Sequence, residues 1–274
     1  MSSIPDLHRA QAARQRPQRA AAAVLLLALL AGCAAIGPQA GPATAGQKAD
    51  PFETFNRKVF DFNDAVDKAV LKPAAEGYRR YVPSLVRTGI GNVFGNINDA
   101  WSSVNNLLQG KPSDAFNDWG RVLVNTTIGI GGAFDVASEM GLDKHYEDFG
   151  QTMAVWGAGE GAYLFWPVIG PRTVRDTAGF VVDSYTDPVW YIYPVDVRNT
   201  LVGVRYIDQR AALLPTDKII EEGATDKYAY IRDAYLQHRR NAVYDGNPPR
   251  EAVLPNGKAP VELQSTPGSS RGTK

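Results

Sequence analysis

The sequence predicts an all-α domain over residues 50–245. Apolar residues recur at spacings of three and four along several segments, and helix start signals precede some of them. All five Trp, twelve Tyr and ten Phe lie between Phe52 and Tyr244. Only this part of the chain therefore has the bulky side chains that a core needs.

Residues 1–32 are predicted to be a signal peptide. Four arginines precede an unbroken apolar run over residues 20–31. That run is too short to span a bilayer as a helix, which takes about 20 residues, but it is typical of a signal-peptide apolar region. Leu30-Ala31-Gly32-Cys33 then resembles the lipobox of bacterial lipoproteins. We therefore expect cleavage before Cys33 and lipidation of its thiol.

The segments that flank the domain lack aromatic residues. Residues 33–49 comprise the lipidated cysteine and a flexible tether rich in Ala, Gly, Pro, Gln and Thr. Residues 246–274 are rich in Pro, Gly and Ser, which predicts a disordered tail. Ala34 follows the cysteine, where an aspartate would resemble an inner-membrane retention signal. We therefore expect anchoring at the periplasmic side of the outer membrane.

The first helix is predicted to begin near residue 50. Asp50-Pro51-Phe52-Glu53 combines a capping carboxylate, a proline at the first helical position and an early glutamate. Apolar residues then follow at helical spacing and predict one apolar face. They are Phe52, Phe55, Val59, Phe62, Val66 and Val70.

Three further helices follow from the same periodicity. The apolar residues from Ile90 to Leu108 predict a helix that ends at Gly110-Lys111-Pro112, and Ser113 is expected to cap the next one. The last helix should begin near Asp226. Its predicted common face contains Tyr228, Ile231, Tyr235 and His238.

Three apolar segments are unusual for a water-soluble bundle. Residues 122–134 contain no charge, residues 151–171 contain one and residues 177–195 contain two. Glycine, proline or acids interrupt each segment, so none has the pattern of a membrane span. Their Trp and Tyr residues could fill a core or lie at the level of lipid head groups. Lipidation favours the second alternative, with lipid contact expected at Val168 and Val189.

Composition argues against several function classes. The chain has 29 Lys and Arg and 29 Asp and Glu, so it lacks the basic excess of a nucleic-acid-binding protein. A single cysteine and three distant histidines, His8, His145 and His238, do not suggest a metal site. The glycines at 129–132 favour a tight turn or close packing over a phosphate-binding loop, and a hinge stays open. We expect no metal and no cofactor.

No catalytic residue is predicted. The sequence has neither a Gly-x-Ser-x-Gly nor a His-Glu-x-x-His motif. Glu147 and Asp148 could serve as an acid/base pair, but adjacent acids are usually solvated surface. A lipid-anchored envelope hydrolase and a purely structural tethering lipoprotein remain the alternatives to a transport protein.

Several motifs, in order along the domain, resemble the MlaA/VacJ family of outer-membrane lipoproteins. The resemblance covers residues 50–245. The motifs are Asp50-Pro51-Phe52-Glu53-Thr54-Phe55-Asn56-Arg57, Tyr81-Val82-Pro83, Asn125-Thr126, Gly129-Ile130-Gly131-Gly132 with Asp135-Val136-Ala137, Asp148-Phe149-Gly150, Pro167-Val168-Ile169-Gly170-Pro171, Arg175-Asp176 and Arg232-Asp233-Ala234-Tyr235. One departure is Lys227, which follows Asp226 where the family often has a proline.

The resemblance implies a ring-like helical domain, embedded in the inner leaflet of the outer membrane, with a central amphipathic channel. Such a protein removes mislocalised phospholipids from the outer leaflet and maintains lipid asymmetry without catalysis. The implied partners are phospholipid, an outer-membrane porin trimer, and a soluble periplasmic lipid carrier that feeds an inner-membrane ABC transporter. A polar-lined path agrees with the physics, because a head group that crosses hydrocarbon unaided leaves polar groups unsatisfied.

Overall fold

The computed structural model describes residues 50–249, which lie within one compact unit, Ala45–Lys274. The predicted signal peptide, Cys33, the tether and residues 250–274 of the predicted tail lie outside the described residues.

Helices make up most of the first half of the described chain. The elements are α3 (Glu53–Val66), the π-helix η1 (Asp67–Leu71), α4 (Lys72–Tyr81), α5 (Ser84–Leu108), α6 (Pro112–Thr127) and α7 (Val136–Glu139). The predicted helices near residues 50, 90–108 and 113–123 are thereby confirmed, and α5 begins earlier than the periodicity indicated.

The second half of the described chain contains both helices and strands. Its elements are α8 (Phe149–Val155), β1 (Tyr163–Trp166), β2 (Gly170–Thr173), α9 (Val174–Thr186), the 3₁₀-helix η2 (Pro188–Tyr191), α10 (Val195–Gly223) and α11 (Lys227–Val243). Of these only α11 was predicted. The interrupted apolar segment at 151–171 forms α8 and the β1–β2 hairpin.

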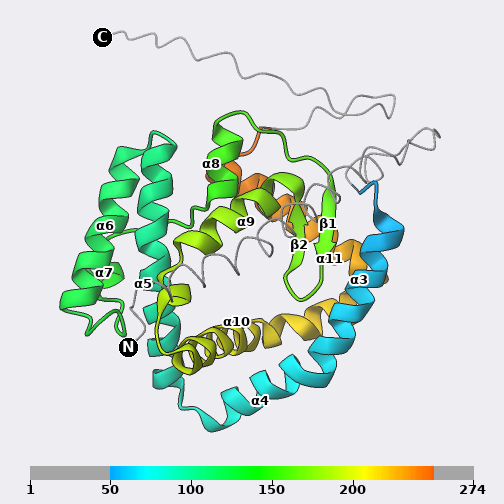
Figure 1. Cartoon of the computed structure of the whole chain (residues 1–274), viewed down its shortest axis with the longest axis horizontal. Helices are drawn as coiled ribbons and strands as arrows, with labels where there is room; N and C mark the ends of the chain where they lie inside the picture. The colour runs from blue at the N-terminus through cyan, green and yellow to red at the C-terminus, as the bar shows by residue number, and fades with distance from the viewer. Residues whose placement is uncertain (1–49, 250–274) are drawn as a thin grey trace, which may run out of the picture. The chain divides into compact units, whose positions relative to one another are not determined.

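The helices follow one another in a ring within this unit. Figure 1 shows α3 and α4 in succession, α10 lying along α4, and α5 on the opposite side from α3. Packing of α10 against both α4 and α5, and of α5 against α6, supports this arrangement. The predicted class, a ring-like helical domain, is confirmed with one antiparallel hairpin added.

Local signals explain some helix starts and not others. The predicted start of the last helix near Asp226 is confirmed, and Asp226 caps α11 by accepting a hydrogen bond from the Ala229 amide. The expected caps at Asp50 and Ser113 are wrong, because α3 and α6 begin without a side-chain cap. Asp50 is instead buried and accepts a hydrogen bond from the side-chain Nδ2 of Asn56 at 2.7 Å.

Burial is inverted on several helices. The buried residues of α5 are mostly Asn, Asp and Ser, while Val104 and Leu108 of its apolar pattern are exposed. On α3 the one buried residue is Asn56, and Phe55 and Phe62 are exposed. The predicted apolar face of α3 therefore exists, but much of it faces outward.

A small aromatic cluster is the apolar core. Tyr163, Phe165 and Tyr228 are buried together, with Phe60 packed edge-on against Phe165 at 5.5 Å between ring centroids. Strand β1 and helix α11 thus meet on α3. Ile231 and Tyr235 of α11 also pack here, as their spacing predicted, but His238 is exposed and does not share the buried face.

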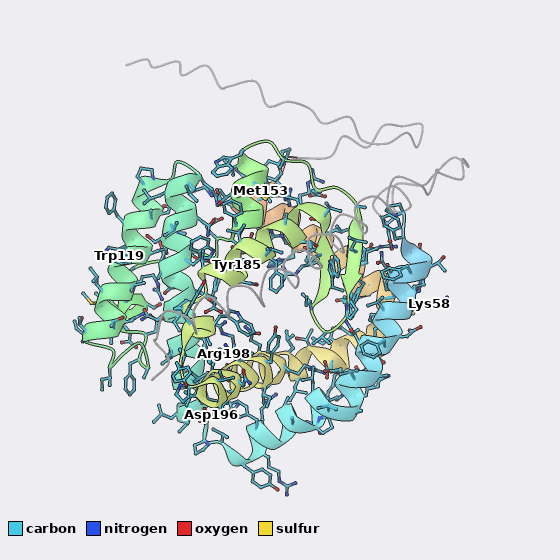
Figure 2. All side chains as sticks on the ribbon, in the orientation of Figure 1. Lys58, Trp119, Met153, Tyr185, Asp196 and Arg198 are labelled. Carbon is cyan, nitrogen blue, oxygen red and sulfur yellow. The ribbon has the colours of Figure 1, made fainter. Side chains whose placement is uncertain are left out.

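Apolar side chains are abundant on the outside. Figure 2 shows Trp119 on the outer side of α6, where half of its surface is exposed, and Phe116 of the same helix is 72% exposed. Among residues 50–249, no helix combines the length and the apolar character needed to cross a membrane.

Candidate functional site

A cavity of about 690 Å³ lies inside the helical unit. Its wall is built by α5, α9, η2 and α10, with residues of the β1–β2 hairpin and of α6. Apolar and aromatic groups form part of the wall. They are Ile97, Trp101, Val122, Ile169, Phe180, Trp190 and Val202.

Charged groups share this wall. Arg205 of α10 is paired with Asp187, and its guanidinium carbon lies 4.8 Å from the centre of the Phe94 ring. Asp183 of α9 accepts hydrogen bonds from Trp101 Nε1 at 2.7 Å and the Phe149 amide at 3.0 Å. Burial nevertheless raises the pKa of Asp183. Arg172 of β2 adds a second guanidinium to the wall, which is therefore amphipathic.

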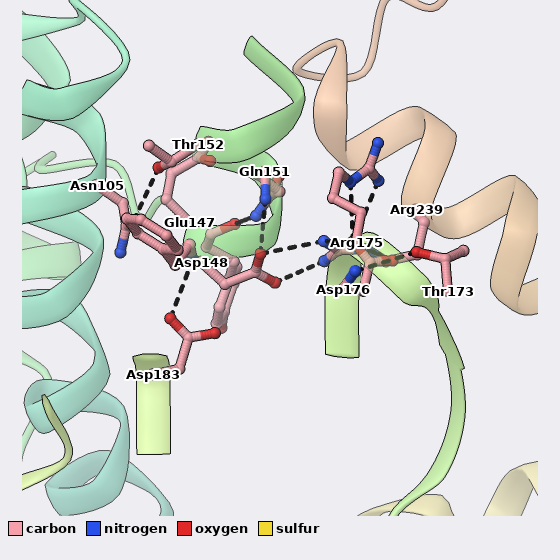
Figure 3. A network of polar contacts seen from close by, with 12 residues as sticks. Asn105, Glu147, Asp148, Gln151, Thr152, Thr173, Arg175, Asp176, Asp183 and Arg239 are labelled. Atoms are coloured by element: carbon pink, nitrogen blue, oxygen red, sulfur yellow. Dashed lines mark hydrogen bonds and ion pairs between the residues drawn. The ribbon is translucent and has the colours of Figure 1, made fainter. Parts of the chain in front are cut away.

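A buried ionic network ties α11 to the cavity wall. Figure 3 shows Arg239 between two carboxylates: its Nη2 lies 3.0 Å from Asp148 Oδ1 and 2.8 Å from Asp176 Oδ1. Asp148 caps α8 through the Gln151 amide, and Asp176 lies in the first turn of α9. Three helices are thus joined by one guanidinium.

The electrostatics of this network favour its ionised form. Burial alone would raise the pKa of Asp176, but hydrogen bonds and charge from Arg239 outweigh it and lower the pKa to about 2. Tyr235 of α11 adds a hydrogen bond to Asp176 Oδ2 at 2.7 Å. Neutralising Asp176 therefore weakens the joint between α9 and α11.

A second network centres on Arg121 of α6, whose side chain is fully buried. Its Nε lies 3.0 Å from Asp99 Oδ2, and its Nη2 lies 2.9 Å from Asp135 Oδ1. Burial opposes ionisation of Asp135, but hydrogen bonds from Ser138, Asn125 and Arg121 hold its pKa well below the usual range. This network fixes α5 and α6 to the turn that precedes α7.

Two asparagines of α3 hold the hairpin. Asn56 donates to the Tyr163 carbonyl at 3.1 Å and accepts from the Phe165 amide at 2.8 Å. Further along the helix, Asn63 donates to the Trp166 carbonyl at 2.9 Å and accepts from the Val168 amide at 2.8 Å. A spacing of seven places both on the same side of the helix. The polar residues thereby complete the backbone hydrogen bonds of strand β1.

The glycine cluster after α6 forms a tight turn. Gly131 and Gly132 have φ angles of 67° and 89°, in the left-handed region that favours glycine. A Cβ on Gly132 would also lie 2.9 Å from Asn96 Cβ. The structure thus agrees with a turn and close packing against α5.

Other sequence-predicted positions are placed differently. The expectation of a solvated Glu147–Asp148 pair is wrong for Glu147, whose side chain is 7% exposed and binds Gln109 Nε2 at 2.8 Å, whereas the Asp148 side chain is 36% exposed and binds Arg239. His145 Nδ1 lies 2.9 Å from buried Asp118 Oδ1, far in sequence from exposed His238. Within the part of the chain that the structure describes, no group of His, Cys, Asp or Glu could hold a metal ion. Cys33 lies outside that part.

The fold and the cavity define a class of helical protein: polar networks are buried around an amphipathic cavity, and apolar side chains cover much of the outside. The model of the family described as MlaA lipoprotein matches residues 48–242. The chain belongs to this family.

Named relatives span nearly the whole domain. The chain is 34% identical to a protein of Escherichia coli, over 88% of this chain and 94% of that one, and 33% identical to one of Haemophilus influenzae, over 81% and 91%. Both are named intermembrane phospholipid transport system lipoprotein MlaA. A solved structure described as a structural basis for maintenance of bacterial outer membrane lipid asymmetry matches with a TM-score of 0.63 and 33% identity, covering 72% of this chain and 99% of that one.

Proposed function

We propose that this protein removes phospholipids from the outer leaflet of the outer membrane and releases them on the periplasmic side, which maintains lipid asymmetry. The observation that carries the proposal is the amphipathic wall of the cavity. A phospholipid has a charged head group and apolar chains, and this wall offers Arg172, Asp183 and Arg205 beside aromatic and aliphatic groups. The relatives' names support the same function.

The exposed apolar side chains support a position partly within one leaflet. Phe116 and Trp119 on α6, and Val168 at the hairpin turn, present apolar surface that water does not favour. In the proposed arrangement these groups contact lipid, and the lipid anchor on Cys33 keeps the domain at the outer membrane. A Cys33→Ser variant should lose acyl labelling and leave the membrane fraction in part, and unchanged acyl labelling would refute the anchor.

The proposed pathway needs partners on both sides. A porin trimer in the outer membrane would hold the domain at its proper depth, and a soluble periplasmic carrier would take the released lipid to an inner-membrane ABC transporter. We propose that the protein itself performs no catalysis, since a conduit needs only a path and a barrier to leaks.

A variant that fills the cavity tests the proposal. Ala100 lines the cavity, whereas Ala65 is exposed on α3, so Ala100→Phe should block lipid passage and Ala65→Phe should not. The assay compares cells that lack the gene with cells that express each variant. It measures the phospholipid that a membrane-impermeant amine reagent labels at the cell surface.

Cells without the gene should show raised surface phospholipid, and the wild type and Ala65→Phe should restore the normal level. No rise in the absence of the gene would refute the transport function. Hydrolysis of lipid esters by the purified chain would instead support the envelope hydrolase. If Ala100→Phe restored the normal level of surface phospholipid, this cavity would be excluded as the path.

A further inference from the structure

Arg172 occupies a specific side of the hairpin. It pairs with Leu164 in the β1–β2 register, next to the Tyr163–Thr173 pair. Tyr163 and Thr173 are buried, and successive residues of a strand point to opposite faces. Strand alternation therefore directs Arg172 away from the aromatic core, and it lines the cavity.

The guanidinium of Arg172 is held by an aromatic ring and not by an acid. Its central carbon lies 4.0 Å from the centre of the Phe180 ring. No carboxylate of residues 50–249 forms an ion pair with it within 4.0 Å. Its Nε is buried and has no hydrogen-bond partner in the described structure. Burial also lowers the pKa of Arg172, although an arginine remains protonated.

The neighbouring acids are occupied by other groups. Asp148 and Asp176 act on Arg172 from a longer distance, but both are bound directly by Arg239. Asp183 binds Trp101 and the Phe149 amide. Arg205, the other arginine of the wall, has its own partner in Asp187. Arg172 is therefore a partly buried cation with an unused donor.

Such an arrangement is costly to the fold, because a buried charge is favourable only when it is paired and hydrogen-bonded. An unpaired cation beside a cavity is expected where a ligand supplies the anion. The planar fork of a guanidinium matches the oxygens of a phosphate, and the Phe180 ring fixes its plane.

We propose that Arg172 binds the phosphodiester group of a glycerophospholipid inside the cavity. This inference rests on the proposed function and specifies its ligand. Every glycerophospholipid with an esterified head group has this phosphodiester, whatever the head group is, and diacylglycerol lacks it. Arg172 would therefore admit phospholipids as a class and disfavour neutral lipids, while Ile169 and Phe180 contact the apolar part of the same molecule.

Binding by the full chain in neutral detergent tests this assignment. The wall tryptophans Trp101 and Trp190 provide an intrinsic fluorescence signal. The probes are a short-chain phosphatidylcholine, the diacylglycerol with the same chains, and inorganic phosphate. Arg172→Met removes the charge at similar length, Arg172→Lys keeps the charge but not the fork, and Arg79→Met is the control because Arg79 is exposed and outside this cavity.

The wild type should bind phosphatidylcholine more tightly than diacylglycerol. Arg172→Met should weaken phosphatidylcholine binding by about tenfold, the effect of losing a charge-assisted hydrogen bond, and leave diacylglycerol binding unchanged. Arg172→Lys should be intermediate and Arg79→Met unchanged. Since Arg172 has no internal ion pair, Arg172→Met should also melt no lower than Arg79→Met.

Each other outcome identifies a different failure. Unchanged phosphatidylcholine binding in a folded Arg172→Met variant would refute the role of Arg172 and leave the proposed function intact. If that variant does not fold, wild-type affinity in Arg172→Lys would refute the need for the fork. Displacement by inorganic phosphate as effective as by lipid would indicate a free-phosphate site. A wild type that binds neither lipid would refute the proposed function and this inference together.

Discussion

Replacing Arg239 by methionine should strongly destabilise the domain. Arg239 forms hydrogen bonds with Asp148 and Asp176, including Nη1 to Asp148 Oδ2 at 2.5 Å and Nε to Asp176 Oδ2 at 3.0 Å. Methionine would leave Asp148 without its cation and would leave Asp176, which is almost completely buried, with Arg175 alone at 3.1 Å. Breaking a buried ion pair from one side typically costs about 3–5 kcal/mol.

The expected loss is large enough to measure by thermal unfolding in detergent. For a domain of roughly 200 residues, each kcal/mol lowers Tm by about 2–4 °C, so Arg239→Met should lower it by roughly 6–20 °C. Arg79→Met is the matched control: Arg79 is exposed, and its substitution should change stability by less than about 0.5 kcal/mol.

A double variant separates lost charge pairing from lost packing. Combining Arg239→Met with Asp148→Asn removes the carboxylate that has no other cation, since Asp176 keeps Arg175, and an asparagine at 148 can still cap α8. We expect this variant to recover part of the lost Tm. A double variant no more stable than Arg239→Met, or a single variant with wild-type Tm, would refute the electrostatic explanation.

Three further results are expected. Gly132→Ala should lower the free energy of unfolding by about 1–3 kcal/mol in a denaturant titration, because alanine disfavours the positive φ of this residue and its Cβ would press on Asn96. Wild-type stability of this variant would show that the turn adapts. The pKa of Asp176 is lower in the folded protein than in the unfolded chain, where it is near 4, so its ionised form stabilises the fold at pH values above about 4. This contribution of about 2 kcal/mol to the free energy of unfolding should be lost as the pH falls from about 4 towards 2. In Asp176→Asn this part of the pH dependence should be absent, and an acid unfolding curve as steep as that of the wild type would contradict the assignment. In a chain without its lipid anchor, Val168→Lys should weaken binding to vesicles by roughly tenfold, because about 1.5 kcal/mol of apolar burial is lost. The control Gln237→Lys adds the same charge at an exposed polar site and should not weaken binding. Equal effects of the two variants would contradict lipid contact at the hairpin.

Periodicity predicted where helices form but not which side of them is buried. The spacing of Phe55 and Phe62 correctly indicated a helix, yet the residues that fix α3 to the hairpin are Asn56 and Asn63. A signal was present, because two asparagines seven residues apart share one face. A hydrophobicity pattern assumes a water-soluble protein and assigns such residues to the surface.

Residues of the apolar segments also differ in exposure in ways that composition cannot resolve. Val168 and Val189 were both expected to contact lipid, but Val168 is 64% exposed and Val189 is 2% exposed. The expectation is therefore wrong for Val189. Its burial depends on how η2 packs against α10, and that contact joins parts of the chain whose arrangement is set by the tertiary fold.

The residues of the candidate site were the least predictable from sequence. Arg172 lies between an apolar segment and a helix start, and nothing local marks it as a cavity residue. Its position follows from the register of the hairpin, whose strand β1 and turn are held on α3 by Asn56 and Asn63. A one-residue shift would turn Arg172 to the other face.

The inverted burial explains how a cavity of this size can remain open. In a water-soluble domain, apolar side chains on facing helices close such a space because burial removes them from water. Here Arg121 and Arg239 hold the surrounding helices through directional ion pairs, while only a small aromatic cluster packs as an apolar core. These bonds fix distances between helices without filling the space between them. Apolar surroundings strengthen such networks, because electrostatic interactions grow as the local dielectric constant falls. Apolar surroundings would also cover Phe116 and Trp119, which are exposed on the outside of the domain. A leaflet of lipid would therefore stabilise both the outside of the domain and the frame that keeps its cavity open.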